Sequence, residues 1–352
     1  MRRVSFIFIA LAALALSACA ETMAPPPPAE EVLLVVNSTE ATLSVVPVAN
    51  PSRSQKIQLG GTSPTPVGVV ARGSLALVPL GLDNAVAVVD LAAGTVVRRI
   101  PLPPGSGATG AAFVNDSIAY IANPNLNSVT RINILRGDTA TTAAGQYPQG
   151  LVFTRGRLFV LNGNFASCPP PNYLCLMGPS WLTVIDPITN RRLGDRDSIP
   201  LAGPGNAQFA AVGGDGLLYV MNTGSYGTGE GRLSIVDPVA RQEVASFAGF
   251  GNAPGRIAIS GERLFVSSFS EGLMVFDTRT RQVVRGAGQG IPARGNSAVD
   301  VDSQGRIYLI ESGPCQGGNP GRARIFDTSL NEIRSVPLGE CSFGTAVTKI
   351  GG

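Results

Sequence analysis

The chain of 352 residues contains no histidine. Histidine is the side chain that most often acts as a general base near neutral pH, and it is the commonest metal ligand. Its absence excludes Ser-His-Asp and Cys-His catalysis, and it excludes zinc, copper and haem sites held by histidine. Only Asp, Glu, Tyr, Arg, Lys and Cys remain for acid–base or covalent chemistry.

Charge is also scarce, because charged residues make up 14% of the chain and leave a net charge of only +3. No run of Lys or Arg exceeds two residues. Non-specific binding to nucleic acid needs a concentrated cationic surface, so we expect no nucleic-acid partner. Apolar residues, at 44%, are sufficient for a sizeable core. Glycine and proline are plentiful but scattered, which is typical of many short strands and turns.

The first residues have the three parts of a secretory signal peptide. Arg2 and Arg3 give a positive start, an apolar run extends over Val4–Leu16, and small residues follow. The run is shorter than the roughly 20 apolar residues of a membrane span. This order favours a cleaved leader over the alternative of a buried hydrophobic helix.

The segment Leu16-Ser17-Ala18-Cys19 resembles the lipobox of bacterial lipoproteins. The resemblance implies a signal peptide over residues 1–18 and acylation of Cys19, so that the protein meets the membrane through its lipid anchor only. Ala20 implies outer-membrane sorting in a Gram-negative cell, facing the periplasm or the cell surface. Residues 19–30 include four consecutive prolines and predict an extended tether.

Four cysteines remain besides Cys19, and an even number in an exported chain predicts two disulfides. Cys168 and Cys175 enclose only six residues, so we pair them, which leaves Cys315 with Cys341. Zinc held by four thiolates is the alternative. The usual Cys-x2-Cys spacing is absent, and an oxidising compartment disfavours such a site.

A pair of apolar strands recurs about every 40 to 50 residues. The first strand usually ends in a polar residue and the second in aspartate. The first strand lies at 33–37, 119–123, 158–162, 218–222, 264–268 and 307–311, and the second ends at 47, 90, 133, 186, 237, 277 and 327. Further strands precede and follow each pair, so each repeat has four strands, a to d. This pattern predicts an all-β fold, a seven-bladed β-propeller over residues 31–352.

The first and last repeats complement one another. The first repeat lacks strand a, because it begins at Glu31 with strand b, whereas a spare strand at 345–350 follows the last repeat. We expect this C-terminal strand to close blade 1, because closing the ring removes exposed sheet edges.

The segments LYVMN with LSIVDP, and LFVLN with LTVIDPITN, resemble the YVTN-type β-propeller repeats of bacterial surface and periplasmic proteins. The resemblance extends over about residues 31–352, is strongest in blades 4 and 5, and departs at the aspartate in blades 1 and 3. Blade 7 also resembles NHL and gluconolactonase-like repeats. With Trp181 as its single tryptophan, the chain lacks the repeated tryptophans of WD40 and quinoprotein propellers. These motifs imply a fold rather than an activity.

Two sets of polar residues recur at the strand ends. We expect both sets to form turns, in preference to an acidic ring or a binding site. They are the strand-c aspartates Asp90, Asp186, Asp237, Asp277 and Asp327, and the strand-b asparagines Asn37, Asn123, Asn162 and Asn222.

Asp300, Asp302 and Glu311 are weak candidates for a calcium site. The run from Asp300 resembles the start of an EF-hand loop, with Glu311 at the twelfth position. Gln304 occupies a position where EF-hands use Asp or Asn, and the run lies in a hairpin. A plain a–b turn explains the segment better, so no metal or cofactor is expected.

The b–c loops of blades 4, 5 and 7 are long, at 163–181, 223–232 and 312–322. In a propeller, b–c and d–a connections share one face, so both predicted disulfides fall on it. The candidates for binding a partner are Phe165, Tyr173, Leu174, Met177, Trp181 and Arg256. As alternatives, the apolar side chains pack onto the blade, and Arg256 is solvated or paired with an aspartate.

The lipid anchor, the scaffold-type motifs and the lack of histidine together predict a non-enzymatic binding or scaffold module of the cell envelope. Its partner would be an unknown envelope protein or a small ligand. One alternative is a propeller-type lactonase or lyase that uses carboxylates and a divalent metal in the central channel. Another is a purely structural envelope component.

Overall fold

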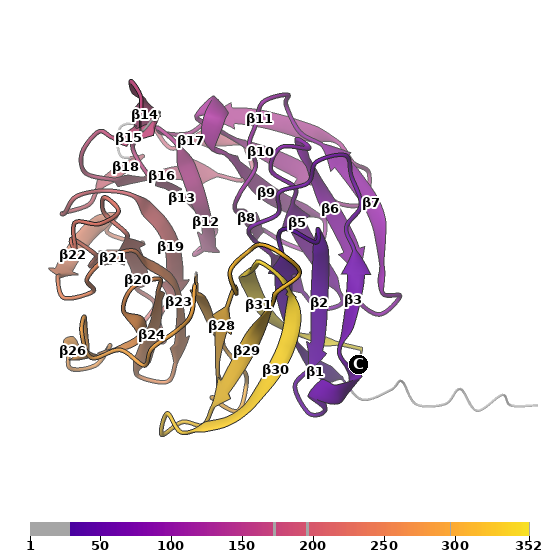
Figure 1. Ribbon diagram of the computed structural model, residues 1–352. Helices are drawn as coiled ribbons and strands as arrows, with labels where there is room; N and C mark the ends of the chain where they lie inside the picture. Colours follow the sequence, from indigo (N-terminus) through magenta and orange to yellow (C-terminus); the bar gives the residue numbers. More distant parts are fainter. Residues whose placement is uncertain (1–28, 172–173, 195–196, 296, 352) are drawn as a thin grey trace, which may run out of the picture.

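The computed structural model describes residues 29–171, 174–194, 197–295 and 297–351. Within these ranges it is all β apart from two short 3-10 helices, η1 (Pro51–Arg53) and η2 (Pro124–Leu126). Seven antiparallel sheets are arranged in a ring as the blades of a propeller (Figure 1). The predicted fold class is therefore confirmed.

Blades 1 to 3 each have four strands, which follow one another from the channel outwards in the order a to d. Blade 1 contains β31 (Ser342–Ile350), β1 (Glu30–Asn37), β2 (Thr42–Pro47) and β3 (Gln55–Gln58). Blade 2 contains β4 (Val70–Arg72), β5 (Leu75–Pro79), β6 (Ala85–Asp90) and β7 (Thr95–Pro101). Blade 3 contains β8 (Ala111–Phe113), β9 (Ile118–Asn123), β10 (Ser128–Asn133) and β11 (Thr139–Ala143).

Blades 4 to 7 follow the same plan, with a split outer strand in blade 4. Blade 4 contains β12 (Pro148–Thr154), β13 (Arg157–Asn162), β16 (Trp181–Asp186), β17 (Arg191–Arg192) and β18 (Ser198–Pro200). Blade 5 contains β19 (Ala207–Val212), β20 (Leu218–Asn222), β21 (Arg232–Asp237) and β22 (Gln242–Phe247). Blade 6 contains β23 (Pro254–Ser260), β24 (Arg263–Ser268), β25 (Gly272–Asp277) and β26 (Gln282–Arg285). Blade 7 contains β27 (Ser297–Val301), β28 (Ile307–Glu311), β29 (Pro320–Phe326) and β30 (Glu332–Glu340).

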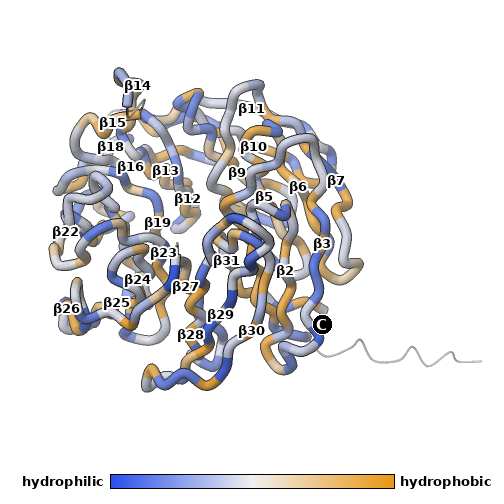
Figure 2. Tube along the Cα trace, in the orientation of Figure 1, coloured by the Kyte–Doolittle hydropathy of each residue, from blue (hydrophilic) through white to orange (hydrophobic). Residues whose placement is uncertain are grey.

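Strands b and c of each blade lie between two neighbouring blades and are therefore buried on both faces. This explains their near-continuous apolar sequences, such as VLLVV in β1, where every side chain from Val32 to Val36 is fully buried. The hydropathy-coloured trace in Figure 2 shows hydrophobic segments along the blade strands and hydrophilic ones in many connections. Outer strands such as β11 are mostly exposed and rich in threonine.

The core consists of seven apolar clusters in the described part of the chain, one between each pair of neighbouring blades. One cluster joins blade 7 to blade 1 through residues such as Leu33, Val46, Ile310 and Val336. The ring is thus closed by side-chain packing as well as by strand pairing.

Strand β31 pairs with β1 and completes blade 1, as the sequence predicts. The two strands are antiparallel, with Glu30 opposite Ile350 and Leu33 opposite Val347. The closing strand begins at Ser342, three residues before the predicted 345, and β1 begins at Glu30, one residue before the predicted domain boundary. The terminal strands therefore protect one another's edges.

The strand-c aspartates form turns, as predicted. In blade 5, for example, Asp237 Oδ1 accepts hydrogen bonds from the backbone N–H groups of Val239 at 2.8 Å and Ala240 at 2.9 Å. The corresponding aspartates of the other blades make the same kind of local bond: Asp90, Asp186, Asp277 and Asp327.

The prediction that the strand-b asparagines form turns is wrong. All four are fully buried, and their amides bond to the neighbouring strand c or to the d–a connection. Asn123 Nδ2 donates to Ser128 Oγ at 3.2 Å and Thr130 Oγ1 at 2.8 Å. Asn37 Oδ1 in turn accepts from the N–H of Gly339 at 3.0 Å. A buried amide must find such partners, so the position is an internal cross-link.

Candidate functional site: the channel mouth and its rim

The antiparallel blades place all b–c and d–a connections on one face of the ring, which we call the upper face. The a–b and c–d turns lie on the opposite, lower face. The chain enters β1 from the lower face, where Glu30 is paired with the C-terminal residue of β31, Ile350. The upper face therefore points away from the start of the propeller.

A cavity of about 350 Å³ lies at the upper end of the central channel. Its wall consists largely of backbone and apolar side chains, with Phe209 and Phe343 as the aromatic members. Gln149, Gln208 and Arg256 supply side-chain polar groups, and Arg256 is the only charged residue in the wall as far as the described residues show. The site is thus a mainly apolar pocket with one cation.

When the seven blades are aligned by the pairing of strand a with strand b, one residue of each innermost strand occupies the same position at the channel mouth. It is occupied, from blade 1 to blade 7, by Gly344, Gly68, Gly110, Gly150, Phe209, Arg256 and Ala298. A Cβ atom on Gly110 would lie 2.3 Å from the carbonyl oxygen of Gln149, and one on Gly150 would lie 2.2 Å from that of Gln208. Neighbouring blades therefore approach too closely for side chains at these glycines, whereas blades 5 and 6 carry large side chains at the same position.

Arg256 contacts Phe209 through a cation–π interaction, with its Cζ atom 5.7 Å from the ring centroid. Within the described residues, its guanidinium group makes no hydrogen bond and no ion pair. Burial in the channel lowers the pKa of Arg256 and the Asp300 carboxylate opposes this shift, but an arginine remains protonated at any ordinary pH. The side chain therefore presents a fixed positive charge.

Asp300 lies deeper in the channel, in a second cavity of about 400 Å³ whose wall also includes Arg256. Burial raises the pKa of Asp300, and the positive charge of Arg256 opposes this shift. Its Oδ1 atom accepts a hydrogen bond from the N–H of Val301 at 2.9 Å. Pairing of Arg256 with an aspartate is one of the alternatives from the sequence. Asp300 interacts with Arg256 only at longer range, and the two residues form no ion pair within 4.0 Å.

The two glutamines of the mouth are held by a buried asparagine. Asn206 Oδ1 accepts hydrogen bonds from Gln149 Nε2 at 3.0 Å and Gln208 Nε2 at 2.7 Å. Gln208 Nε2 also donates to the hydroxyl of Tyr226 at 3.3 Å. The side-chain carbonyl oxygens of both glutamines have no partner among the described residues, so they remain available as acceptors.

Exposed apolar side chains lie on the upper face at the b–c turns of five consecutive blades. We call this set the apolar rim: Leu82, Leu126, Met177, Tyr226 and Phe269, each between 40% and 67% exposed. Sequence reasoning found only Met177. Leu82, Leu126 and Phe269 are single residues in short turns, and Tyr226 lies in the long b–c loop of blade 5 but was not singled out.

The predicted partner-binding residues of blade 4 divide into two groups. Leu174 and Met177 are exposed. Phe165 and Trp181 are half-buried, and the Phe165 ring packs edge-on against Tyr147 with centroids 5.4 Å apart. Tyr173 lies outside the described residues. The loop itself forms a hairpin, β14 (Phe165–Ser167) with β15 (Leu174–Leu176), which the sequence did not predict.

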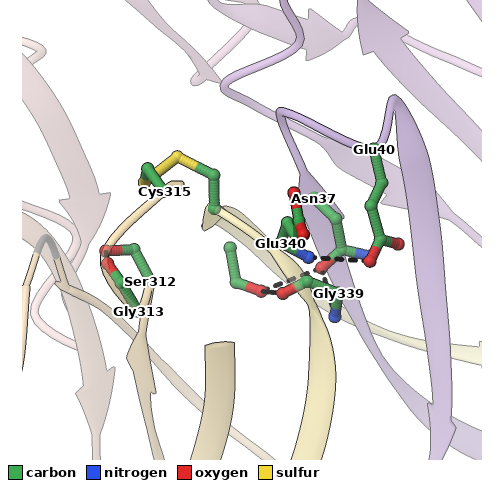
Figure 3. Close-up of a disulfide and its surroundings, with 9 residues drawn as sticks. Asn37, Glu40, Ser312, Gly313, Cys315, Gly339 and Glu340 are labelled. Atoms are coloured by element: carbon green, nitrogen blue, oxygen red, sulfur yellow. Dashed lines mark hydrogen bonds between the residues drawn. A yellow bond between two sulfur atoms is a disulfide. The ribbon is translucent and has the colours of Figure 1, made fainter. Parts of the chain in front are cut away.

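Both predicted disulfides are present, Cys168–Cys175 and Cys315–Cys341. The first closes the hairpin of blade 4. The second lies where blade 7 meets blade 1, and Figure 3 shows Cys315 near Gly339 and Glu340, the last residues of β30. The N–H of Glu340 donates to Glu40 Oε1 at 3.0 Å, so the end of β30 is bonded directly to blade 1.

The three weak metal candidates are not brought together. Asp302 lies in the a–b turn of blade 7, and its carboxylate accepts from Arg306 Nε at 2.6 Å and the Tyr308 hydroxyl at 2.8 Å. Glu311 lies at the other end of β28 and forms ion pairs with Arg322 and Arg324. Across the described ranges, no cluster of three Cys, Asp or Glu side chains is placed to hold a metal ion.

Comparison with known proteins supports the fold of the chain but assigns it no activity or partner. No family model matches the chain, and no curated protein matches its sequence. Among solved structures, it is similar to hydrazine synthase of Kuenenia stuttgartiensis, with a TM-score of 0.59 and 15% identity over 78% of this chain and 88% of that chain. The protein therefore belongs to the class of seven-bladed β-propellers. No helix in the described ranges is long and apolar enough to span a membrane.

Proposed function

We propose that this protein is an exported, lipid-anchored propeller that binds an envelope protein through its upper face and performs no catalysis. Two disulfides are typical of exported chains. The lipobox-like segment ending at Cys19 and the YVTN-like repeats support the same location, although Cys19 and the signal peptide over residues 1–18 lie outside the described residues.

The apolar rim is the observation that carries this proposal. Single exposed apolar residues are ordinary on a protein surface. Here five consecutive blades each place one at a b–c turn of the same face. Aromatic residues and methionine are enriched at protein interfaces, and the rim contains Met177, Tyr226 and Phe269. A partner protein that covers the opening would remove these side chains from water.

The direction of the chain supports the same face. Residues 19–29 would connect the lipid anchor to the lower face, because β1 starts there at Glu30. Fully extended, that segment spans about 40 Å at most. The lower face would then lie toward the membrane, and the apolar rim would be presented to partners on the far side.

Site-specific photo-crosslinking tests the proposal. We would place p-benzoylphenylalanine at Met177 or Phe269 in the native cell envelope, with Ile188 as the matched control. Ile188 is 87% exposed and lies in a c–d turn of the lower face. A discrete crosslinked protein from both rim positions and none from Ile188 is the expected result. Equal crosslinking from both faces, or none from the rim, would show that the upper face is not the binding surface.

No observation on the described residues favours the alternative of a propeller-type lactonase or lyase with a divalent metal in the channel. Such an enzyme needs several carboxylates directed at one point, and the channel mouth has none in its wall. Stoichiometric calcium or another divalent metal in the purified protein would revive this alternative.

A further inference from the structure

We infer that the channel mouth is a second binding site, which takes a carboxylate attached to an apolar body, and that Arg256 holds the carboxylate. This inference goes beyond the proposed function, because it concerns the cavity inside the apolar rim and does not depend on the rim.

The position of Arg256 in the propeller does not itself require a long side chain. Four blades have glycine there and one has alanine, so neither the strand nor the packing between blades requires a long side chain. Its guanidinium group makes no ion pair within the described residues. The side chain is half-buried and faces the channel, so partial loss of hydration is not offset by an ion pair. A ligand anion would supply the missing partner.

The chemistry around Arg256 fits a carboxylate better than a more highly charged anion. A guanidinium group matches a carboxylate with two parallel hydrogen bonds. Arg256 is the only cation in the wall of the described cavity, so a phosphate dianion would retain unpaired charge. The Phe209 ring already orients one face of the guanidinium group, which leaves its edge for the ligand.

The position of Asp300 determines from which side of the channel a ligand anion can reach Arg256. Arg256 lines both the mouth cavity and the deeper cavity, whereas Asp300 lines only the deeper one. An anion that approached from below would meet the Asp300 carboxylate first. The ligand carboxylate therefore rests at the floor of the mouth cavity, and the rest of the ligand points toward the apolar rim.

The upper part of the cavity determines what the carboxylate is attached to. Val69, Leu151, Phe209 and Phe343 form apolar wall, and the glutamine carbonyl oxygens accept from any donor on the ligand. A volume of about 350 Å³ lies within the range of small-molecule pockets, roughly 300–1,000 Å³. Either a free organic acid or the C-terminal carboxylate of a protein held at the rim has this chemistry.

Isothermal titration calorimetry of the purified full protein tests the inference with benzoate as the acid and benzamide as its uncharged analogue. We expect benzoate to bind and benzamide to bind at least about tenfold more weakly. Arg256→Gln should weaken benzoate binding by a similar factor. The matched control is Arg279→Gln, which removes the same charge from an exposed site in the same blade, where Arg279 forms an ion pair with Glu262. It should leave the affinity unchanged.

Further variants and probes make the outcome unambiguous. Asp300→Asn removes the opposing charge and should tighten benzoate binding several-fold. If Arg256→Gln fails to fold, Arg256→Lys keeps the charge without the paired hydrogen bonds and should still bind more weakly than the parent protein. A short apolar peptide with a free C-terminus, compared with its amidated form and with benzoate, distinguishes a partner's C-terminus from a free acid as the source.

Equal binding of benzoate by the parent protein and Arg256→Gln would overturn the inference. So would equal binding of benzamide, tighter binding of inorganic phosphate, or no binding of any acid. Each of these results leaves the rim proposal intact, because crosslinking at Met177 and Phe269 is a separate readout. Conversely, an absence of crosslinks would not affect benzoate binding in the channel.

Discussion

Removal of the disulfide at the seam between blades 7 and 1 should lower the stability of the whole ring. The perturbation is the double variant Cys315→Ser/Cys341→Ser. Cys341 lies between β30 and β31, and its carbonyl oxygen accepts a hydrogen bond from the N–H of Ser38 in blade 1 at 2.9 Å. The disulfide therefore holds the connection through which the chain closes the propeller.

The size of the effect follows from the length of the closed loop. The two cysteines are 26 residues apart, and the chain-entropy relation for a loop of that length gives about 3.5 kcal/mol at 25 °C. A folded domain of about 320 residues has an unfolding entropy near 0.7 kcal/mol/K. The expected fall in Tm is therefore about 5 °C.

Differential scanning calorimetry measures the fall in Tm, and hydrogen exchange locates its origin. We expect the amides of β31 and of its partner β1 to exchange faster in the seam variant. The matched control is Cys168→Ser/Cys175→Ser, which opens the hairpin of blade 4. That hairpin is a separate two-stranded sheet, so it can unfold locally without opening the blade. Its Tm should change by less than about 2 °C.

The reasoning would be refuted by either of two results. In one, the hairpin variant loses as much Tm as the seam variant. In the other, β31 is protected from exchange equally well in both variants, which would mean that strand pairing with β1 closes the ring without help from the disulfide.

Three further predictions concern the blades. The pKa of Asp302 is lowered, because hydrogen bonds from Tyr308 and Arg306 outweigh its burial. The stability that Asp302 contributes is therefore present above its ordinary pKa of about 3.9. This stability is lost as the pH falls through the lower pKa of the folded state. Asp302→Asn should therefore be less stable at neutral pH, by about 3 kcal/mol, and should show a flatter decline of Tm below pH 4. Burial and the bond to Asp215 raise the pKa of Tyr219 to about 12, so its contribution is full below pH 10 and is lost toward pH 12. Urea unfolding should show that Tyr219→Phe loses less stability than the parent over that window. A chain that ends at Cys341 lacks β31 and exposes the edge of β1, and size-exclusion chromatography should show aggregates instead of a folded monomer.

Features that depend on short stretches of chain can be predicted from the sequence. Each strand-c aspartate bonds to N–H groups two to four residues further on, so its role is contained in its own turn. The pairing of Cys168 with Cys175 follows from their closeness in the chain. The closure of blade 1 needs only the number of strands, because one strand is missing at the start and one is left over at the end.

Features that depend on contacts across the sheet or between blades could not be predicted. The strand-b asparagines resemble turn residues in sequence, and only the register reveals that Asn123 faces Ser128 and Thr130 of strand c. Three blades depart from the motif, because blade 2 has Leu80 after β5, blade 6 has Ser268 and blade 7 has Glu311 where the other four blades have the asparagine. Arg256 was recognised as a candidate, but its relation to Asp300, 44 residues away on the next blade, appears only when the ring is formed.

The innermost strands at the channel mouth contain positions that follow the repeat and positions that depart from it. Four glycines, on blades 1 to 4, satisfy a geometric requirement, since neighbouring innermost strands approach within the reach of a Cβ atom. Phe209 and Arg256 depart from that requirement on two adjacent blades, and the departure brings a half-buried cation into a mainly apolar cavity. Partial burial of a charge without an ion pair costs free energy, and only the contact with the Phe209 ring and the attraction to Asp300 offset this cost. Departures from a repeated structural rule are expected at functional or strained positions. It is the break in the repeat, more than the repeat itself, that leads us to propose a binding site at the channel mouth.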